Sequence, residues 1–210
     1  MLAETPYPTF ERLDDRAALV QLLAHTMTSG AAAAADELLH RFGDFRRTLS
    51  ADLADLAPVV EPETALDLRR VYDAACRLVR SEVSRRDVLS SWPALLAYLK
   101  LTMGAREREA FRVIFLDKKN QIIADEVLGE GTVDHAPVYP REVIRRALVL
   151  SASAMILVHN HPSGDPTPSS ADVEMTRQVV AAARTLCIAV HDHVVVGREQ
   201  VASFRALGLI

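Results

Sequence analysis

The residues Ala154-Met-Ile-Leu-Val-His-Asn-His-Pro-Ser-Gly-Asp-Pro-Thr-Pro-Ser-Ser-Ala-Asp172 set out a strand, a loop and a helix in order. The first five residues are wholly apolar, which is typical of a short strand buried at the centre of a sheet. Pro and Gly residues between positions 162 and 168 turn the chain sharply. A helical pattern then runs from residue 170 to residue 186. This order predicts an α/β domain.

Neighbouring segments supply the other elements of such a domain. Residues 111–116 are β-branched and aromatic, and the polar turn 117–120 leads to a second strand-like run at 121–128, so the pair predicts a hairpin. Residues 140–148 predict a helix with Pro140 in its first turn. Residues 188–196 predict a further strand. We therefore expect an α/β domain over residues 105–210.

The first part of the chain has a different character. From about residue 14 to residue 86 the apolar residues recur at helical spacing, and Pro58 and Pro62 separate two of the helical stretches. Residues 92–103 form another amphipathic pattern, which ends near Gly104. The sequence thus predicts an all-helical bundle over residues 1–86, a linker helix within 87–104, and the α/β domain after it.

Composition narrows the class of protein. The chain has 210 residues and a net charge of -4, so it has no overall positive field that would attract nucleic acid. Cys76 and Cys187 are far apart in sequence and predict small buried side chains rather than a disulfide. No apolar stretch approaches the ~20 residues of a membrane span. The start of the sequence lacks a signal-peptide pattern, so we expect a soluble cytoplasmic protein with no membrane partner.

Three side chains in the first stretch have the spacing of metal ligands. His159 and His161 are two residues apart at the end of a strand, so their side chains point to the same face. Asp172 lies in the first turn of the next helix, from which its carboxylate can swing back over the strand end. Three protein ligands are typical of catalytic zinc, which keeps a fourth position for water and lowers the pKa of that water to about 7.

This spacing of two histidines, a serine and an aspartate resembles the JAMM motif of MPN-domain metalloenzymes. The longer string His159-Asn-His-Pro-Ser-Gly-Asp-Pro-Thr-Pro-Ser169, with Pro140-Arg-Glu-Val upstream and Asp192-His193 downstream, is similar to the bacterial RadC family. The resemblance implies a cytidine-deaminase-like MPN fold, a mixed sheet flanked by helices, and one Zn²⁺ per chain. It also implies Glu126 as general acid and base, and Ser169 as a donor to the oxyanion of a tetrahedral intermediate.

Other interpretations of these residues remain open. Ser169 and Asp172 also have the spacing of a helix capping box, which can hold at the same time as a metal site. Asp125 and Glu130 lie close to Glu126, and either Glu126 or Glu130 could be the general base. An acid on a strand is often only a solvent-facing residue.

Three more residues are predicted to support the site. Asn160 alternates to the face opposite His159 and is expected to fix the loop. Asp192 and His193 are expected to orient a ligand through a carboxylate–imidazole contact. His191 and His193, again two apart, could form a second metal site, although supporting contacts are the commoner role.

The helical region resembles the helix-hairpin-helix modules of RadC proteins in a degenerate form. Such modules approach phosphate through a glycine-rich hairpin. The corresponding residues here, 56–63, contain no glycine and include Glu61 and Glu63. Acids repel phosphate, so the sequence supports direct DNA binding only weakly.

Four functions follow from these observations. The first is a zinc-dependent metallopeptidase that cleaves amide or isopeptide bonds in a peptide or protein substrate. The second is an accessory protein of DNA repair that binds DNA. A metal-dependent nuclease is a variant of the second, and a metal-free MPN scaffold is the remaining alternative. The intact ligand set favours the hydrolase.

Overall fold

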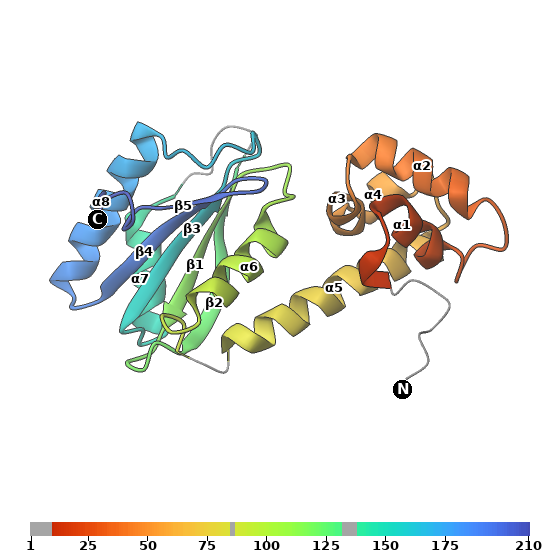
Figure 1. Cartoon of the computed structure of the whole chain (residues 1–210). Coiled ribbons are helices and arrows are strands. Elements are labelled where there is room, and N and C mark those ends of the chain that lie inside the picture. Colours follow the sequence, from red (N-terminus) through yellow and green to blue (C-terminus); the bar gives the residue numbers. More distant parts are fainter. Residues whose placement is uncertain (1–9, 85–86, 132–137) are drawn as a thin grey trace. The chain divides into compact units, whose positions relative to one another are not determined.

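A computed structural model describes residues 10–84, 87–131 and 138–210. The chain divides into two compact units, Met1–Ala75 and Cys76–Ile210 (Figure 1). Residues 1–9 and 85–86 of the predicted helical region lie outside the described residues. Each unit has its own core and is described separately.

The first unit is made of short helices, as the sequence predicts. A 3-10 turn and four helices precede a long one: η1 (Phe10–Arg12), α1 (Asp15–Leu23), α2 (Ala31–Phe42), α3 (Phe45–Ser50), α4 (Leu53–Leu56) and α5 (Pro62–Ser84). Asp14 and Asp44 cap α1 and α3 by accepting hydrogen bonds from backbone N–H groups. Fully buried leucines at positions 19, 23, 38 and 56 form the core of this unit.

Helix α5 runs through the boundary between the two units. The contacts divide the chain between Ala75 and Cys76, inside α5, whereas the sequence pattern places the division at residue 86. The reason is that the last turns of α5 pack elsewhere: Val79 and Val83 belong to the core of the second unit. A helical pattern alone does not reveal which core each turn joins.

The second unit contains a five-stranded sheet in the order β2-β1-β3-β4-β5. Its elements are α6 (Trp92–Met103), β1 (Ala110–Leu116), β2 (Ile122–Glu130), α7 (Pro140–Val149), β3 (Ala154–Asn160), α8 (Ser170–Thr185), β4 (Ala189–Val196) and β5 (Val201–Ser203). The pairing of β3 with β4 is parallel, and the other pairings are antiparallel. The sheet is therefore mixed, and β3 occupies its centre (Figure 1).

Helices cover both faces of this sheet. One face packs on α6 through Leu95, Leu99 and Met103. The other face packs on α7 and α8 through residues that include Val143 and Val179. Residues of β3 alternate between the two cores, since Ile156 and Val158 join the first and Met155 and Leu157 join the second. Every residue of β3 is buried, which accounts for its apolar sequence.

The α/β fold class, the hairpin, the central strand and the helices 140–148 and 170–186 are confirmed, with ends that differ by one or two residues. Residues 92–103 form a helix as predicted. This helix, α6, is more than a linker between the two units, because its apolar side chains form part of the core on one face of the sheet. Strand β5 was not predicted. Cys187 is exposed rather than buried, because it lies in the turn after α8 with a φ of 56°. Among the described residues, no helix has the length and apolar character needed to cross a membrane.

Substitutions of Ile114 and Ile123 test whether an inner strand of the sheet contributes more to stability than the edge strand. Ile114 on β1 is completely buried, whereas Ile123 on the edge strand β2 is 41% exposed. Ile114→Ala should lower the free energy of unfolding by about 2–5 kcal/mol, since it leaves a cavity between β1 and α6. Ile123→Ala should change it by roughly 0.5 kcal/mol. Urea denaturation of the two variants measures this difference, and equal losses would contradict the assignment of the core.

Candidate metal centre

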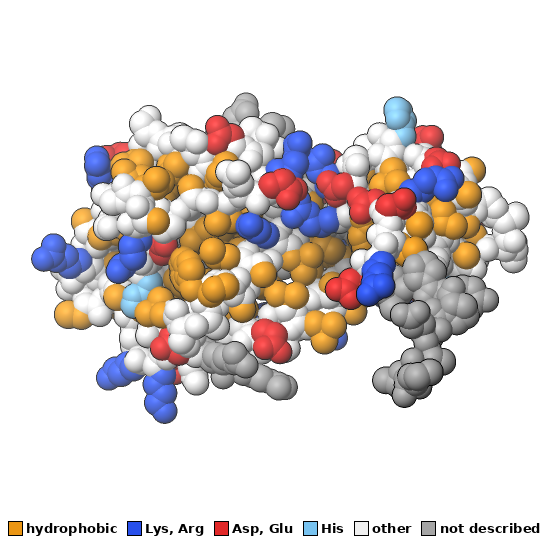
Figure 2. Space-filling view, in the orientation of Figure 1, with side chains coloured by type: hydrophobic (Ala, Val, Ile, Leu, Met, Phe, Trp, Pro, Cys, Tyr) orange, Lys and Arg blue, Asp and Glu red, His pale blue; other side chains and the backbone are white. Residues whose placement is uncertain are grey.

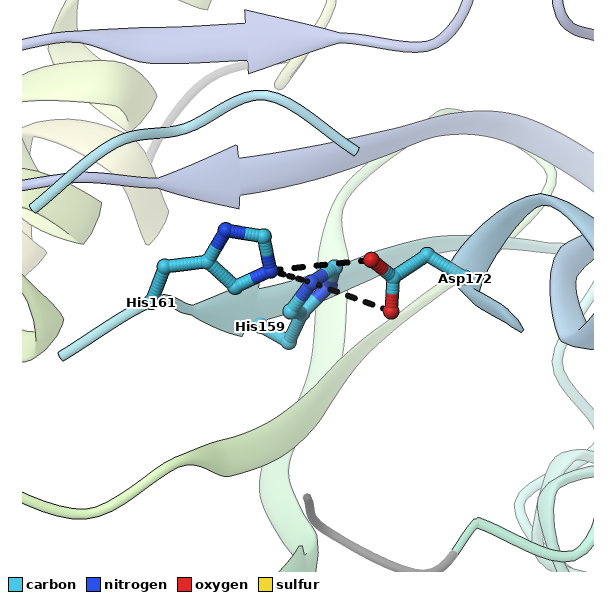
Figure 3. Close-up of side chains that lie close together, drawn as sticks. All are labelled: His159, His161 and Asp172. Carbon is cyan, nitrogen blue, oxygen red and sulfur yellow. Dashed lines mark hydrogen bonds and ion pairs between the residues drawn. The ribbon is translucent and has the colours of Figure 1, made fainter. Parts of the chain in front are cut away.

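Two elements bring the three predicted ligands together. His159 is the last residue but one of β3 and lies on the face that packs on α7 and α8, and His161 follows it by two residues. Asp172 lies in the first turn of α8. The two imidazoles and the carboxylate converge on one point (Figure 3). Among the described residues, these three form the group of His, Cys, Asp or Glu side chains whose ligand atoms lie close enough together to hold one metal ion.

The distances between the ligand atoms suit a small tetrahedral ion. Nε2 of His159 is 2.9 Å from Nε2 of His161. These two atoms are 3.4 and 3.6 Å from the carboxylate oxygens of Asp172. Ligands bound about 2.0–2.2 Å from a tetrahedral zinc lie roughly 3.3–3.6 Å from one another. Both distances to Asp172 fall in this range, and the two histidine nitrogens lie closer together than a bound zinc would hold them. The two nitrogens and one oxygen also match the ligand types that zinc takes in three-ligand sites, so the residues fit this metal.

The loop after β3 fixes the ring of His161. Its Nδ1 lies 2.8 Å from the carbonyl oxygen of Asp165, which can only accept, so Nδ1 donates. In the neutral ring, Nε2 then carries a lone pair and faces the cluster. Hydrogen bonding to Asp172 is the largest cause that raises the pKa of His161, and the contact with Asp165 adds to it.

Close backbone contact holds this loop against the turn between β4 and β5. Gly164 has a φ of +91°, a conformation that suits glycine. A side chain at Gly197 would lie 2.3 Å from the carbonyl oxygen of Gly164. The N–H groups of His161 and Arg198 donate to Val196 and Gly164 across the same gap. The small residues therefore let the loop pack against the sheet.

Ser169 and Asp172 form a complete capping box at the start of α8. The N–H and the hydroxyl of Ser169 both donate to the carboxylate of Asp172, at 2.7 Å each. Burial would raise the pKa of Asp172, but hydrogen bonds from His159 and His161 lower it far below the ordinary value. Asp172 therefore stays ionised, and the hydroxyl proton of Ser169 points at Asp172.

His159 is buried and its second nitrogen contacts another histidine. Its Nδ1 lies 2.8 Å from Nε2 of His193 on β4. Nδ1 of His193 lies 2.6 Å from the hydroxyl of Thr176 on α8. His193 is completely buried, and desolvation lowers its pKa well below the ordinary value, so this ring is neutral. The parallel register explains the contact, because His193 pairs with Leu157, two residues before His159.

Among the described residues, the contacts of Asp192 do not include the carboxylate–imidazole contact that we expected from the sequence. Its carboxylate accepts hydrogen bonds from the hydroxyl of Ser203 and the N–H of Arg205, as well as the backbone N–H of His193. Asp192 and His193 alternate to opposite faces of β4. Asp192 therefore anchors β5 and the following turn, and His193 alone contacts the ligand.

Glu126 lies on the same face of the sheet as His159 but is already paired. Its two carboxylate oxygens accept from the guanidinium of Arg146 on α7, at 2.6 and 2.5 Å. This hydrogen bonding is the largest cause that lowers the pKa of Glu126. The described contacts of Glu126 do not join it to the two histidines or to Asp172. A carboxylate held in this way is poorly suited to take a proton in the cluster.

The two neighbouring acids have other roles. Asp125 pairs with Ile114 in the sheet and faces the α6 side, where its carboxylate contacts Arg112 and Tyr98. Burial is the largest cause that raises the pKa of Tyr98 to about 12. Glu130 pairs with Ala110, which also faces away from His159, and its carboxylate contacts Arg106. Neither acid faces the cluster.

Another acid, Glu109, lies beside the cluster, and it is not among the residues predicted from the sequence. Phe111 pairs directly with His159 across the antiparallel strands β1 and β3. Glu109 precedes Phe111 by two residues, so the register carries it toward His161 on the same face. Its negative charge is one of the causes that raise the pKa of His161, after the larger effect of Asp172. The sequence does show an acid two residues before Phe111, which would lie on the same face of the strand as Phe111. Only the register of β1 against β3 shows that this face is the one that carries His159.

Asn160 holds the segment that carries Glu109. Its side chain points to the opposite face from His159, as predicted, and is 1% exposed. Its Oδ1 accepts from the N–H of Ala110 at 2.9 Å, and its Nδ2 donates to the carbonyl oxygen of Arg108 at 3.1 Å. One side chain thus fixes the backbone on both sides of Glu109.

A comparison with protein families agrees with this geometry. The family model for the RadC-like JAB domain matches residues 89–209, which is more than half of the chain. The match includes α6, the whole sheet and all three residues of the cluster. It does not extend to the first unit.

Asn160→Asp tests how the segment before β1 is held. The substitution replaces the two amide hydrogens with an oxygen that faces the carbonyl of Arg108, so the variant should lose about 1–3 kcal/mol in the free energy of unfolding. Gln178→Glu makes the same chemical change on the exposed face of α8, and should cost about 0.2–0.5 kcal/mol through repulsion from Glu174. Urea denaturation measures both, and a loss no larger at Asn160 than at Gln178 would contradict this role.

Proposed function

The chain belongs to the RadC family, with a RadC-like JAB domain over residues 89–209, and we propose that it is a zinc-dependent hydrolase of the JAMM type that cleaves amide or isopeptide bonds. The observation that carries the proposal is the convergence of His159, His161 and Asp172, whose ligand atoms all lie within 4.8 Å of one another. The substrate class, a peptide or protein, is proposed from the family resemblance.

The three side chains would hold the metal and leave room for a reactant. Nε2 of each histidine and one carboxylate oxygen of Asp172 are the proposed ligands. Zinc in such a site supplies Lewis acidity, which lowers the pKa of water to about 7 and polarises a carbonyl group. The protein holds the ligands still, because His161 is fixed by Asp165 and His159 by His193.

We propose Glu109, in place of Glu126, as the group that moves protons. Its carboxylate would take the proton of the attacking water and return it to the leaving nitrogen. Glu109 faces His161 through the register of β1 and β3, whereas Glu126 is held by Arg146. Ser169 could donate to a developing oxyanion only by turning its hydroxyl away from Asp172, to which it now donates.

Binding to DNA is less well supported. The hairpin between α4 and α5 carries Glu61 and Glu63, both exposed, where phosphate would approach. On the face drawn in Figure 2, Lys and Arg side chains are scattered, and Asp and Glu side chains lie among them. These features favour the hydrolase over an accessory role in DNA repair or a nuclease. A metal-free scaffold would have no need of three converging ligands.

Metal content is the first measurement. Purified protein should contain about one zinc per chain by elemental analysis after reconstitution. His161→Ala and Asp172→Ala should each abolish stoichiometric binding, because each removes one of three ligands. His40→Ala, which changes an exposed histidine on α2, should leave the zinc content unchanged. Folded wild-type protein that takes up no zinc would overturn the proposal.

Glu109→Gln separates proton transfer from metal binding. The variant should retain its zinc but lose about 10²–10⁴-fold in hydrolysis rate, because the amide cannot accept a proton. Cleavage can be followed by mass spectrometry with synthetic peptides that contain ordinary and lysine-linked amide bonds.

Glu107→Gln, an exposed change in the same segment, is the matched control and should be as active as the wild type. Glu126→Gln is the competing variant. If Glu126→Gln abolishes cleavage while Glu109→Gln does not, the proton carrier is Glu126, and its pairing with Arg146 must break during the reaction.

A further inference from the structure

A chain of hydrogen bonds connects two of the proposed metal ligands through the interior. It runs from His159 to His193, then to Thr176, and ends on the backbone of Asp172. Both histidine rings on this path and the threonine are at most 1% exposed. Every buried side-chain nitrogen and oxygen among the described residues has a hydrogen-bond partner.

The direction of this chain is fixed at one end. The hydroxyl of Thr176 lies 2.6 Å from the carbonyl oxygen of Asp172, four residues earlier in α8. A carbonyl oxygen can only accept, so the hydroxyl proton is directed to Asp172. A hydroxyl has one proton, and Thr176 must therefore accept in its second contact, which is with Nδ1 of His193.

The remaining protons follow from that constraint. Because Thr176 accepts, Nδ1 of His193 carries the proton and donates. A neutral imidazole has one donor and one acceptor nitrogen, so Nε2 of His193 is bare and must accept. Its partner is Nδ1 of His159 at 2.8 Å. Nδ1 of His159 therefore carries the proton, and Nε2 of His159 is left with a lone pair that faces the cluster.

We infer that Thr176 is a positioning residue, whose hydroxyl acts through His193 to hold His159 in the Nδ1-protonated tautomer that presents Nε2 to a metal. His161 reaches the same tautomer by a separate route, through the carbonyl of Asp165. When both rings are neutral, each presents the lone pair of its Nε2 to the cluster, where a bound cation would accept both lone pairs. The inference about the tautomer rests on the hydrogen bonds and on the complete burial of His193, which favours its neutral form. Only its consequence for zinc rests on the proposed function.

Thr176→Val tests this role in the full-length chain. Valine keeps the shape of threonine but neither donates nor accepts, so His193 loses the partner that sets its tautomer. Thr176→Ser restores the hydroxyl. Thr185→Val is the matched control, because Thr185 also donates to the carbonyl four residues earlier in α8, but at the exposed end of the helix.

Two measurements read out the effect. In metal-free protein at about pH 8, above the ordinary pKa of histidine, ¹⁵N NMR should show the wild-type His159 protonated at Nδ1, and Thr176→Val should shift it toward a mixture of tautomers. Competition with a chromophoric chelator should show that Thr176→Val binds Zn²⁺ about 10–100-fold more weakly. Thr176→Ser should restore both properties, and Thr185→Val should alter neither.

The outcomes separate the two proposals. Wild-type protein with His159 protonated at Nε2 would overturn the inference, as would a Thr176→Val variant that keeps both the tautomer and the zinc affinity of the wild type. If wild-type protein binds no Zn²⁺, the proposed function fails, but the NMR comparison in metal-free protein still decides the role of Thr176.

Discussion

The double pairing of β3 places every group of the candidate site. On one side, the antiparallel register sets Phe111 of β1 against His159. On the other, the parallel register sets His193 of β4 beside Leu157. A shift of either register by one residue would turn all the side chains of that neighbouring strand to the other face. The hydrophobic residues that β3 sends alternately into two cores hold both registers in place.

Successive side chains of β3 point to opposite faces of the sheet, so two adjacent residues have different roles. His159 faces the cluster, while the next residue, Asn160, faces the opposite side. Asn160 then fixes the segment before β1, and that segment carries Glu109 back to the face of His159. The two histidines and the acid beside them are therefore positioned from both faces of one strand.

The hydrogen bonds around the cluster have fixed donors and acceptors, because they end on backbone carbonyl oxygens. Backbone carbonyl groups orient both histidine rings, since Asp165 accepts from His161 and Asp172 accepts from Thr176. Backbone carbonyls cannot exchange donor and acceptor roles, so they define the tautomers more firmly than side chains could. Asp172 contributes twice, with its carboxylate in the cluster and its carbonyl at the end of the buried chain.

The cluster of three possible metal ligands could be predicted from sequence because their relation is local. His159 and His161 share a face through the two-residue period of a strand, and the start of α8 is marked by its own capping residues, Ser169 and Asp172. The helical first unit and the α/β second unit were likewise visible in the spacing of apolar residues. The proposed general base was harder to predict. Glu126 lies in a strand and Glu109 just before one, and the alternation of side chains along a strand allows either to face the cluster.

Only the tertiary structure distinguishes such residues. The register of β1 on β3 brings Glu109 toward His161. The packing of α7 on the sheet places Arg146 where it forms an ion pair with Glu126. Thr176 and His193 are 17 residues apart in sequence and meet because α8 packs on β4. From the sequence one could predict which residues would hold a metal ion, since short-range geometry fixes their spacing. The fold decided which groups support them, since strand register and helix packing depend on contacts between distant parts of the chain.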